Sequence, residues 1–165
     1  MASLVERERE LAAIDELLER GGALLVEGGA GIGKTALLEE ACRRGAELGR
    51  VVLCARGSEL EKGFAFGVVR QLFERRLATA EACEREALLA GPAGAVGPLL
   101  FGGLADASAF DTSFAMLHGL YWLALNLADE RPLLIAVDDV HWADAPSLRW
   151  LATWLHGLTA RRSRC

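Results

Sequence analysis

The sequence predicts an α/β fold built on a parallel sheet. Three short apolar runs, at residues 23–27, 50–55 and 133–137, are too brief for helices and are typical of buried strands. Segments with helical spacing separate these runs along the chain of 165 residues. Because strands that alternate with helices favour parallel pairing through crossovers, we expect a parallel sheet covered by helices.

The predicted helices cover residues 3–20, 34–48, 66–78, 81–90 and 112–128, and a last helix follows residue 144. Ser3 and Glu6 fit a capping box, and Gly49 is expected to cap the second helix. The segment 112–128 is apolar almost all round, which predicts a helix packed between layers. The Gly/Pro-rich segment 91–110 is expected to form a loop or a partly disordered excursion.

In the last helix, Asp144 is the expected N-cap. Its predicted buried stripe consists of leucines at helical spacing: Leu148, Leu151, Leu155 and Leu158. Trp150 and Trp154 are interpreted as core or as a covered interface.

Composition excludes several classes of protein. With 18 basic and 23 acidic residues, the formal charge of −5 argues against a chain that coats nucleic acid or an anionic membrane. The first ten residues lack the apolar run of a signal peptide, and glycines and prolines interrupt the uncharged stretch 87–105. Cysteines at 42, 54, 83 and 165 form no C-x-x-C pair and are expected to be reduced, core-type thiols. We therefore expect a cytoplasmic domain without a membrane partner and without direct DNA binding.

Residues 28–35 fit the pattern G-x-x-x-x-G-K-[ST], and they follow a predicted strand and precede a predicted helix. In such a loop, backbone N–H groups turn toward phosphate oxygens, and the helix that follows offers its positive end. Lys34 is expected to reach the β- and γ-phosphates and Thr35 to ligate Mg²⁺. The predicted nucleotide-binding residues are Gly28, Gly29, Ala30, Gly31, Ile32, Gly33, Lys34 and Thr35.

A dinucleotide fingerprint, G-x-G-x-x-A, also fits Gly31, Gly33 and Ala36. That motif requires an acid at the end of the second strand, where this sequence has Ala55 and Arg56. It also leaves Lys34 without a role, so the phosphate-loop interpretation is favoured.

Two aspartates follow the third apolar run. A carboxylate at the carboxyl end of a parallel strand lies where such sheets bind ligands, so Asp138 is expected to hold Mg²⁺. Asp139 is expected either to orient an attacking water or to bond to neighbouring backbone. His141 is interpreted as a structural hydrogen-bonding residue and Trp142 as a packing residue.

Four segments, residues 5–11, 28–35, 56–72 and 137–144, resemble the N-terminal ATPase domain of the large ATP-binding regulators of the LuxR family. These regulators belong to the STAND branch of AAA-like P-loop ATPases. The resemblance implies a three-layer P-loop NTPase sandwich that switches with ATP and Mg²⁺. It also implies that Arg7 lies near the adenine, that Lys34 and Thr35 hold phosphate and magnesium, and that Asp138 and Asp139 end the Walker B strand. The expected catalytic residues are Lys34 and Asp139.

Members of that family are longer, with a sensor strand, a helical lid, repeats and a DNA-binding end. Residues 1–165 are therefore expected to be a partial ATPase domain, truncated after Walker B, whose sheet lacks its central strand. The expected function is ATP binding with weak or absent hydrolysis, and the expected partner is a second copy or the rest of a longer regulator. Two alternatives stay open: a free-standing P-loop enzyme such as a small-molecule kinase, and a non-functional gene remnant.

Overall fold

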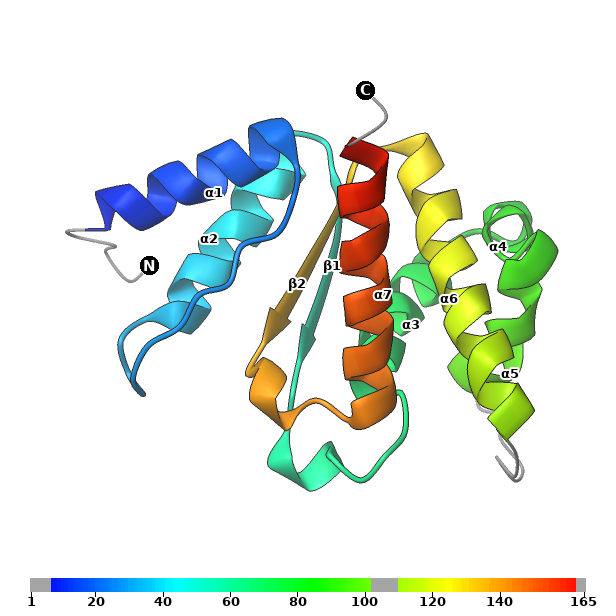
Figure 1. Ribbon diagram of the computed structural model, residues 1–165. Helices are drawn as coiled ribbons and strands as arrows, with labels where there is room; N and C mark the ends of the chain where they lie inside the picture. Colours follow the sequence, from blue (N-terminus) through cyan, green and yellow to red (C-terminus); the bar gives the residue numbers. More distant parts are fainter. Residues whose placement is uncertain (1–6, 102–109, 163–165) are drawn as a thin grey trace.

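The computed structural model describes residues 7–101 and 110–162 and shows a small parallel sheet between helices (Figure 1). In chain order the elements are α1 (Glu8–Arg20), α2 (Lys34–Glu47), β1 (Val51–Arg56), η1 (Glu59–Glu61), α3 (Gly67–Thr79), α4 (Ala82–Leu88), η2 (Gly91–Val96), α5 (Gly97–Leu100), α6 (Phe110–Glu130), β2 (Leu133–Asp138), η3 (Val140–Trp142) and α7 (Ala145–Arg162). The predicted capping box at Ser3 and Glu6 lies outside the described residues.

The two strands pair in parallel, from Val51 opposite Leu133 to Arg56 opposite Asp138. Because side chains alternate along a strand, Val51, Leu53 and Ala55 are buried on one face of β1 while Val52 lies on the other. Both strands therefore end at the same edge of the sheet, which places Arg56 and Asp138 together.

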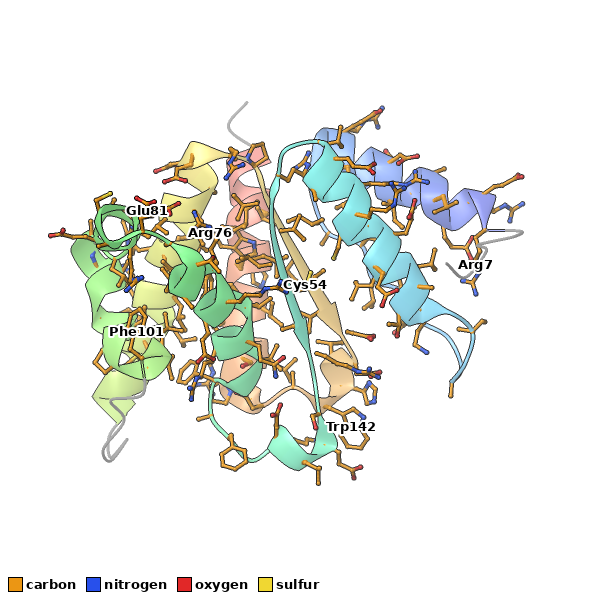
Figure 2. All side chains as sticks on the ribbon, turned by 180° about the vertical axis from the view of Figure 1, so that it is seen from behind. Arg7, Cys54, Arg76, Glu81, Phe101 and Trp142 are labelled. Carbon is orange, nitrogen blue, oxygen red and sulfur yellow. The ribbon has the colours of Figure 1, made fainter. Side chains whose placement is uncertain are left out.

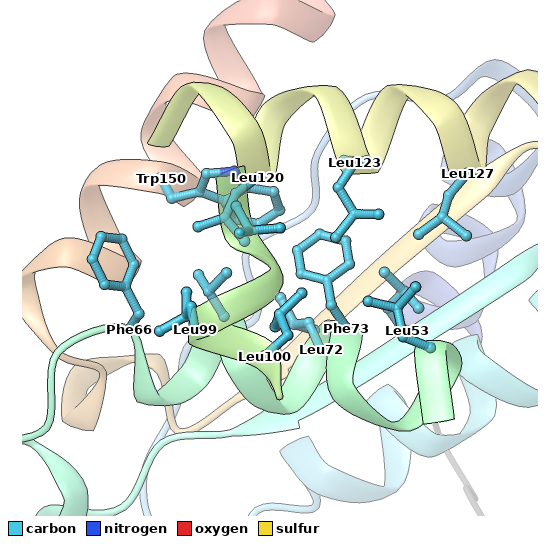
Figure 3. Packing of buried hydrophobic residues seen from close by; sticks show 14 of the residues in the cluster. Leu53, Phe66, Leu72, Phe73, Leu99, Leu100, Leu120, Leu123, Leu127 and Trp150 are labelled. Atoms are coloured by element: carbon cyan, nitrogen blue, oxygen red, sulfur yellow. The ribbon is translucent and has the colours of Figure 1, made fainter. Parts of the chain in front are cut away.

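The larger core lies on the face covered by α3, α6 and α7 (Figure 3). Phe73 on α3 lies between Leu53 of β1 and Leu123 of α6, and its ring meets Trp150 edge to face with centroids 5.4 Å apart. Trp150 is fully buried, so the interpretation of this tryptophan as core is confirmed. A fully buried aromatic pair of this kind contributes about 0.5–1.5 kcal/mol beyond its buried area.

The smaller core lies on the opposite face, under α1 and α2. Ile14 and Leu18 of α1 and Leu37 of α2 pack with Leu134 of β2. Gly45 allows this approach, since an added Cβ would lie 2.7 Å from a Leu134 methyl. At the end of α2, Gly49 has a φ of 73° and donates its N–H to Ala46, as its predicted capping role requires.

The predicted strand 23–27 is wrong, because residues 21–29 form no regular secondary structure. Leu24 and Leu25 are 42% and 71% exposed. A strand requires a neighbour for its backbone N–H and C=O groups, and in the part of the chain that is described only β1 and β2 pair. The apolar composition of this run was therefore insufficient to predict its conformation.

The loop expected over 91–110 is also wrong where the structure describes it. Residues 91–100 form η2 and α5, with a proline in the first turn of each. Val96, Leu99 and Leu100 are buried in the larger core. Residues 102–109 lie outside the described residues.

Two further expectations about helix faces need correction. Helix α6 is not covered all round, since Phe114 is 75% and Trp122 39% exposed. On α7, Leu151 of the predicted stripe packs against the core, but Leu148 and Leu155 are exposed. Trp150 and Trp154 pack against the core beside Leu151. None of the described helices has the length and apolar character needed to cross a membrane.

Candidate functional site

The glycine-rich loop 28–33 leads directly into α2, which begins at Lys34. Gly31 and Gly33 have φ values of 77° and 88°, a left-handed conformation that glycine adopts without steric cost. The first N–H groups of a helix have no intrahelical partner and carry the positive end of the helix dipole. Loop and helix together therefore present an exposed set of donors suited to an anion.

Lys34 lies folded over this loop. Its Nζ donates hydrogen bonds to the carbonyl oxygens of Gly28, at 2.9 Å, and Gly29, at 2.8 Å. The ammonium group is thus held beside the donors of the loop, where phosphate oxygens can replace the two carbonyls as its acceptors.

Thr35 connects the loop to the end of β2. Its Oγ1 donates to a carboxylate oxygen of Asp138 at 2.8 Å, between residues 103 positions apart in the chain. The other carboxylate oxygen of Asp138 accepts the N–H of Asp139 at 2.9 Å. The structure thus brings together the hydroxyl and the carboxylate that the sequence predicted as magnesium ligands.

Asp139 faces the end of β1. One of its carboxylate oxygens accepts hydrogen bonds from Nη2 and Nε of Arg56, at 2.8 and 3.0 Å. This bond raises the pKa of Arg56 above its ordinary value, with smaller contributions from the charges of Asp139 and Asp138. The backbone of Asp139 has the left-handed conformation, with φ 48° and ψ 42°, which aspartate adopts more readily than most residues.

Two residues of the site, Arg56 and Gly57, were not predicted from the sequence. Gly57 donates its N–H to the Asp138 carbonyl at 2.9 Å, and an added Cβ there would lie 2.4 Å from the Asp139 carbonyl oxygen. The chain after β1 therefore contacts the chain after β2 backbone to backbone. The parallel register was the available signal, because it places Arg56 opposite Asp138.

An open hollow of about 620 Å³ lies beside this junction. Figure 2 shows Trp142 near the carboxyl ends of the strands, and the Nζ of Lys62 lies 5.4 Å from the centre of its ring. The hollow is lined by Arg56, Gly57, Ser58, Glu59, Glu61, Gln71, Asp139 and Trp142. His141 is exposed and its ring centroid lies 5.0 Å from that of Trp142.

Arg7 lies against the glycine loop, at the start of α1 (Figure 2). Its guanidinium donates to the Ile32 carbonyl, lies 3.3 Å from Glu10, and would be 3.6 Å from a Cβ added to Gly33. Arg7 therefore joins α1 to the backbone of the loop.

Asp144 caps α7, as predicted, by accepting the N–H of Ser147 at 2.8 Å. It also accepts the backbone N–H groups of Phe66 and Val68 at the start of α3, at 2.8 and 3.4 Å. No pattern in the sequence predicts this second cap, which holds the start of α3 against the segment that follows Asp139.

Within the described residues no group of three or more histidine, cysteine, aspartate and glutamate side chains could hold a metal ion. The donors beside the loop are instead one hydroxyl and one carboxylate. Their oxygens are 2.8 Å apart, and adjacent ligands of an octahedral Mg²⁺ with bonds of 2.0–2.1 Å lie about 2.9 Å apart. The pair therefore fits two neighbouring positions around a magnesium ion.

Comparison with known families matches residues 3–165 to the AAA ATPase domain. No curated protein and no solved structure matched the chain. The match covers nearly the whole chain, it implies nucleotide binding, and the mixed α/β structure with its small parallel sheet is consistent with an incomplete P-loop fold. The chain belongs to the AAA ATPase domain family.

Proposed function

We propose that this domain binds ATP with Mg²⁺ at the junction of the glycine loop, α2 and the end of β2. The observation that carries the proposal is the 2.8 Å hydrogen bond between Thr35 and Asp138. This bond brings the hydroxyl of the phosphate loop to the end of β2, where Asp138 and Asp139 are adjacent. Of the strands in the described residues, only β2 ends in two carboxylates.

Each residue then has a separate task. The N–H groups of 28–33 and of the first turn of α2 hold the phosphates, and Lys34 exchanges its bonds with Gly28 and Gly29 for phosphate oxygens. Thr35 and Asp138 hold the metal ion, which supplies positive charge to the phosphate oxygens when bound. Arg7 lies beside the loop, where it supports the backbone at Ile32.

Hydrolysis is proposed to be slow or absent. A residue that orients water needs a free carboxylate oxygen directed at that water. In this structure Arg56 donates two hydrogen bonds to one carboxylate oxygen of Asp139, so the ion pair holds this side chain toward the end of β1 and only its other oxygen can serve a water. Binding without rapid turnover suits a switch better than it suits a metabolic enzyme.

We further propose that the switch belongs to a LuxR-type transcriptional regulator of the STAND class. The support is the resemblance of residues 5–11, 56–72 and 137–144 to that family, together with the nucleotide motif. In this proposal a second copy or the rest of a longer chain, and not DNA, is the direct partner of the domain.

The test is a thermal melt of the purified chain with and without Mg-ATP. At a ligand concentration one hundred times Kd, binding adds about 2.7 kcal/mol to the free energy of unfolding, which raises Tm by about 5–10 °C. Lys34→Ala is expected to abolish the shift, and Lys62→Ala, which removes the only other lysine, is expected to keep it. A cooperative melt whose Tm does not respond to Mg-ATP would refute the proposal.

A further inference from the structure

Two cysteines that the sequence analysis treated as separate core thiols meet in the fold. Cys42 lies on α2 and Cys54 on β1, and their sulfur atoms are 3.1 Å apart. Neither thiol is fully buried, since Cys42 is partly exposed and Cys54 exposed, so the expectation of core-type thiols is wrong for this pair. Figure 2 shows Cys54 on β1, beside α2 and α3.

The separation suits covalent bond formation. A disulfide needs its sulfur atoms about 2.05 Å apart, so the two side chains have to close about 1 Å. The exposure of Cys54 leaves it open to a small oxidant, which a buried pair would exclude.

The two thiols differ in acidity, which assigns them different tasks. The hydrogen bond from Cys42 lowers the pKa of Cys54 to about 7, against a desolvation effect that raises it, and the positive charge of Arg75 lowers it further. The pKa of Cys42 is raised by the same bond, by burial and by the negative charges of Cys54 and Glu39. Cys54 is therefore the more acidic of the two thiols, and it is also the more exposed one.

We propose that Cys42 and Cys54 form a disulfide-forming site that reacts with low-molecular-weight disulfides, with Cys54 as nucleophile and Cys42 as resolving thiol. The Cys54 thiolate attacks one sulfur of the small disulfide, whose S–S bond breaks and releases one thiolate that takes a proton from solvent. Cys42 then loses its proton to solvent, and its sulfur attacks Cys54 in the mixed disulfide and releases the second small thiol. The two protein thiols are oxidised by two electrons to one disulfide, and the small disulfide is reduced to two thiols.

The product joins the helix of the nucleotide loop to the sheet. Cys42 lies about two turns after Lys34 on α2, and β1 is the strand that ends in Arg56. The site rests on the positions and exposure of the two thiols and is independent of whether the domain binds ATP.

The experiment is peptide mapping of the folded, reduced chain after incubation with oxidised glutathione and blocking of the remaining thiols. Trypsin separates Cys42, in peptide 35–43, from Cys54, in peptide 51–56. We expect these two peptides to be linked, and we expect the initial rate to rise about tenfold per pH unit below pH 7 and to level off above it.

The variants separate the two steps. Cys42→Ser is expected to retain glutathione on Cys54, and Cys54→Ser is expected to leave Cys42 a free thiol. Cys83→Ser, which removes an exposed thiol on α4, is expected to form the linked peptides at the wild-type rate. The proposal is overturned if the wild-type chain keeps glutathione on Cys54, if Cys83 or Cys165 provides the link, or if no link forms.

Discussion

Replacing Asp144 by alanine tests how the end of the site is fixed to the rest of the fold. This carboxylate is 4% exposed and accepts four hydrogen bonds: from the N–H groups of Phe66, Val68 and Ser147 and from the Ser147 hydroxyl at 2.6 Å. It therefore serves the first turns of both α3 and α7.

The expected loss follows from these bonds. Removing an aspartate cap costs about 1 kcal/mol per helix, and each buried donor left without an acceptor costs about 1–3 kcal/mol. The cap bonds and the buried donors at Phe66 and Ser147 are the same interactions, so the two donors set the total, and we expect Asp144→Ala to lower the free energy of unfolding by about 2–6 kcal/mol.

Urea unfolding followed by far-UV circular dichroism measures this loss. For a denaturant slope of about 2 kcal/mol/M, the midpoint falls by about 2 M. The backbone N–H groups of Phe66 and Ser147 donate to the same oxygen of Asp144, and Asp144→Asn keeps an oxygen that can accept both bonds. We expect this variant to lose about 1–2 kcal/mol of the free energy of unfolding. Loss of a single buried hydrogen bond costs at least about 1 kcal/mol. An Asp144→Ala chain whose free energy of unfolding lies within about 1 kcal/mol of the wild-type value would therefore refute this reasoning.

Three further predictions concern other parts of the molecule. Gly57→Ala forces a Cβ against the Asp139 carbonyl and is expected to cost about 1–3 kcal/mol and to weaken Mg-ATP binding in a thermal shift assay. Gly63→Ala, which meets no atom within 4 Å, is the control, and equal effects of the two would contradict the prediction. Trp150→Ala empties a fully buried position and is expected to cost about 3–5 kcal/mol in urea unfolding, well above Trp122→Ala, whose side chain is 39% exposed. Glu40 accepts hydrogen bonds from two arginines of α2, and these bonds lower its pKa from 4.5 to about 2, with Arg43 contributing more than Arg44. The stabilisation by the Glu40 carboxylate is therefore complete above pH 4.5 and is lost as the pH falls toward 2. We expect the difference in free energy of unfolding between wild type and Glu40→Gln to narrow over that range. A difference that stays constant between pH 7 and pH 2.5 would contradict this prediction.

The sequence predicted those elements whose signals are local. The spacing of apolar residues located α2, α3 and α6, and the runs at 50–55 and 133–137 correspond to β1 and β2. The run at 23–27 failed because a strand depends on a neighbour elsewhere in the chain, which no local pattern contains.

The segment 91–100 failed for a different reason. Its glycines and prolines suggested a loop, but Pro92 and Pro98 stand in first turns, where a missing N–H has no cost. Gly119 of α6 then lets this segment come close, since a Cβ there would lie 3.0 Å from the Pro92 carbonyl oxygen. Tertiary packing, rather than local preference, decided the structure.

At the site, the motif located the loop and the aspartates, because residue type and spacing carry that information. The contacts of Arg56 and Gly57 with the Asp139 segment were missed, because they depend on the register between strands far apart in the chain. The same holds for Cys42 and Cys54, which lie on neighbouring elements but show no paired motif.

The parallel register of the sheet also sets the order of events during synthesis. Val51 pairs with Leu133, so 133 − 51 = 82 residues must be made after β1 begins before its partner exists. At about 5–20 residues per second, β1 waits about 4–16 s on the ribosome. During that time its apolar residues and unpaired backbone groups are open to other chains, and closing so long a loop makes strand pairing a late and slow step of folding. We therefore expect the yield of folded chain to depend on translation speed and on chaperones that cover β1 until β2 emerges.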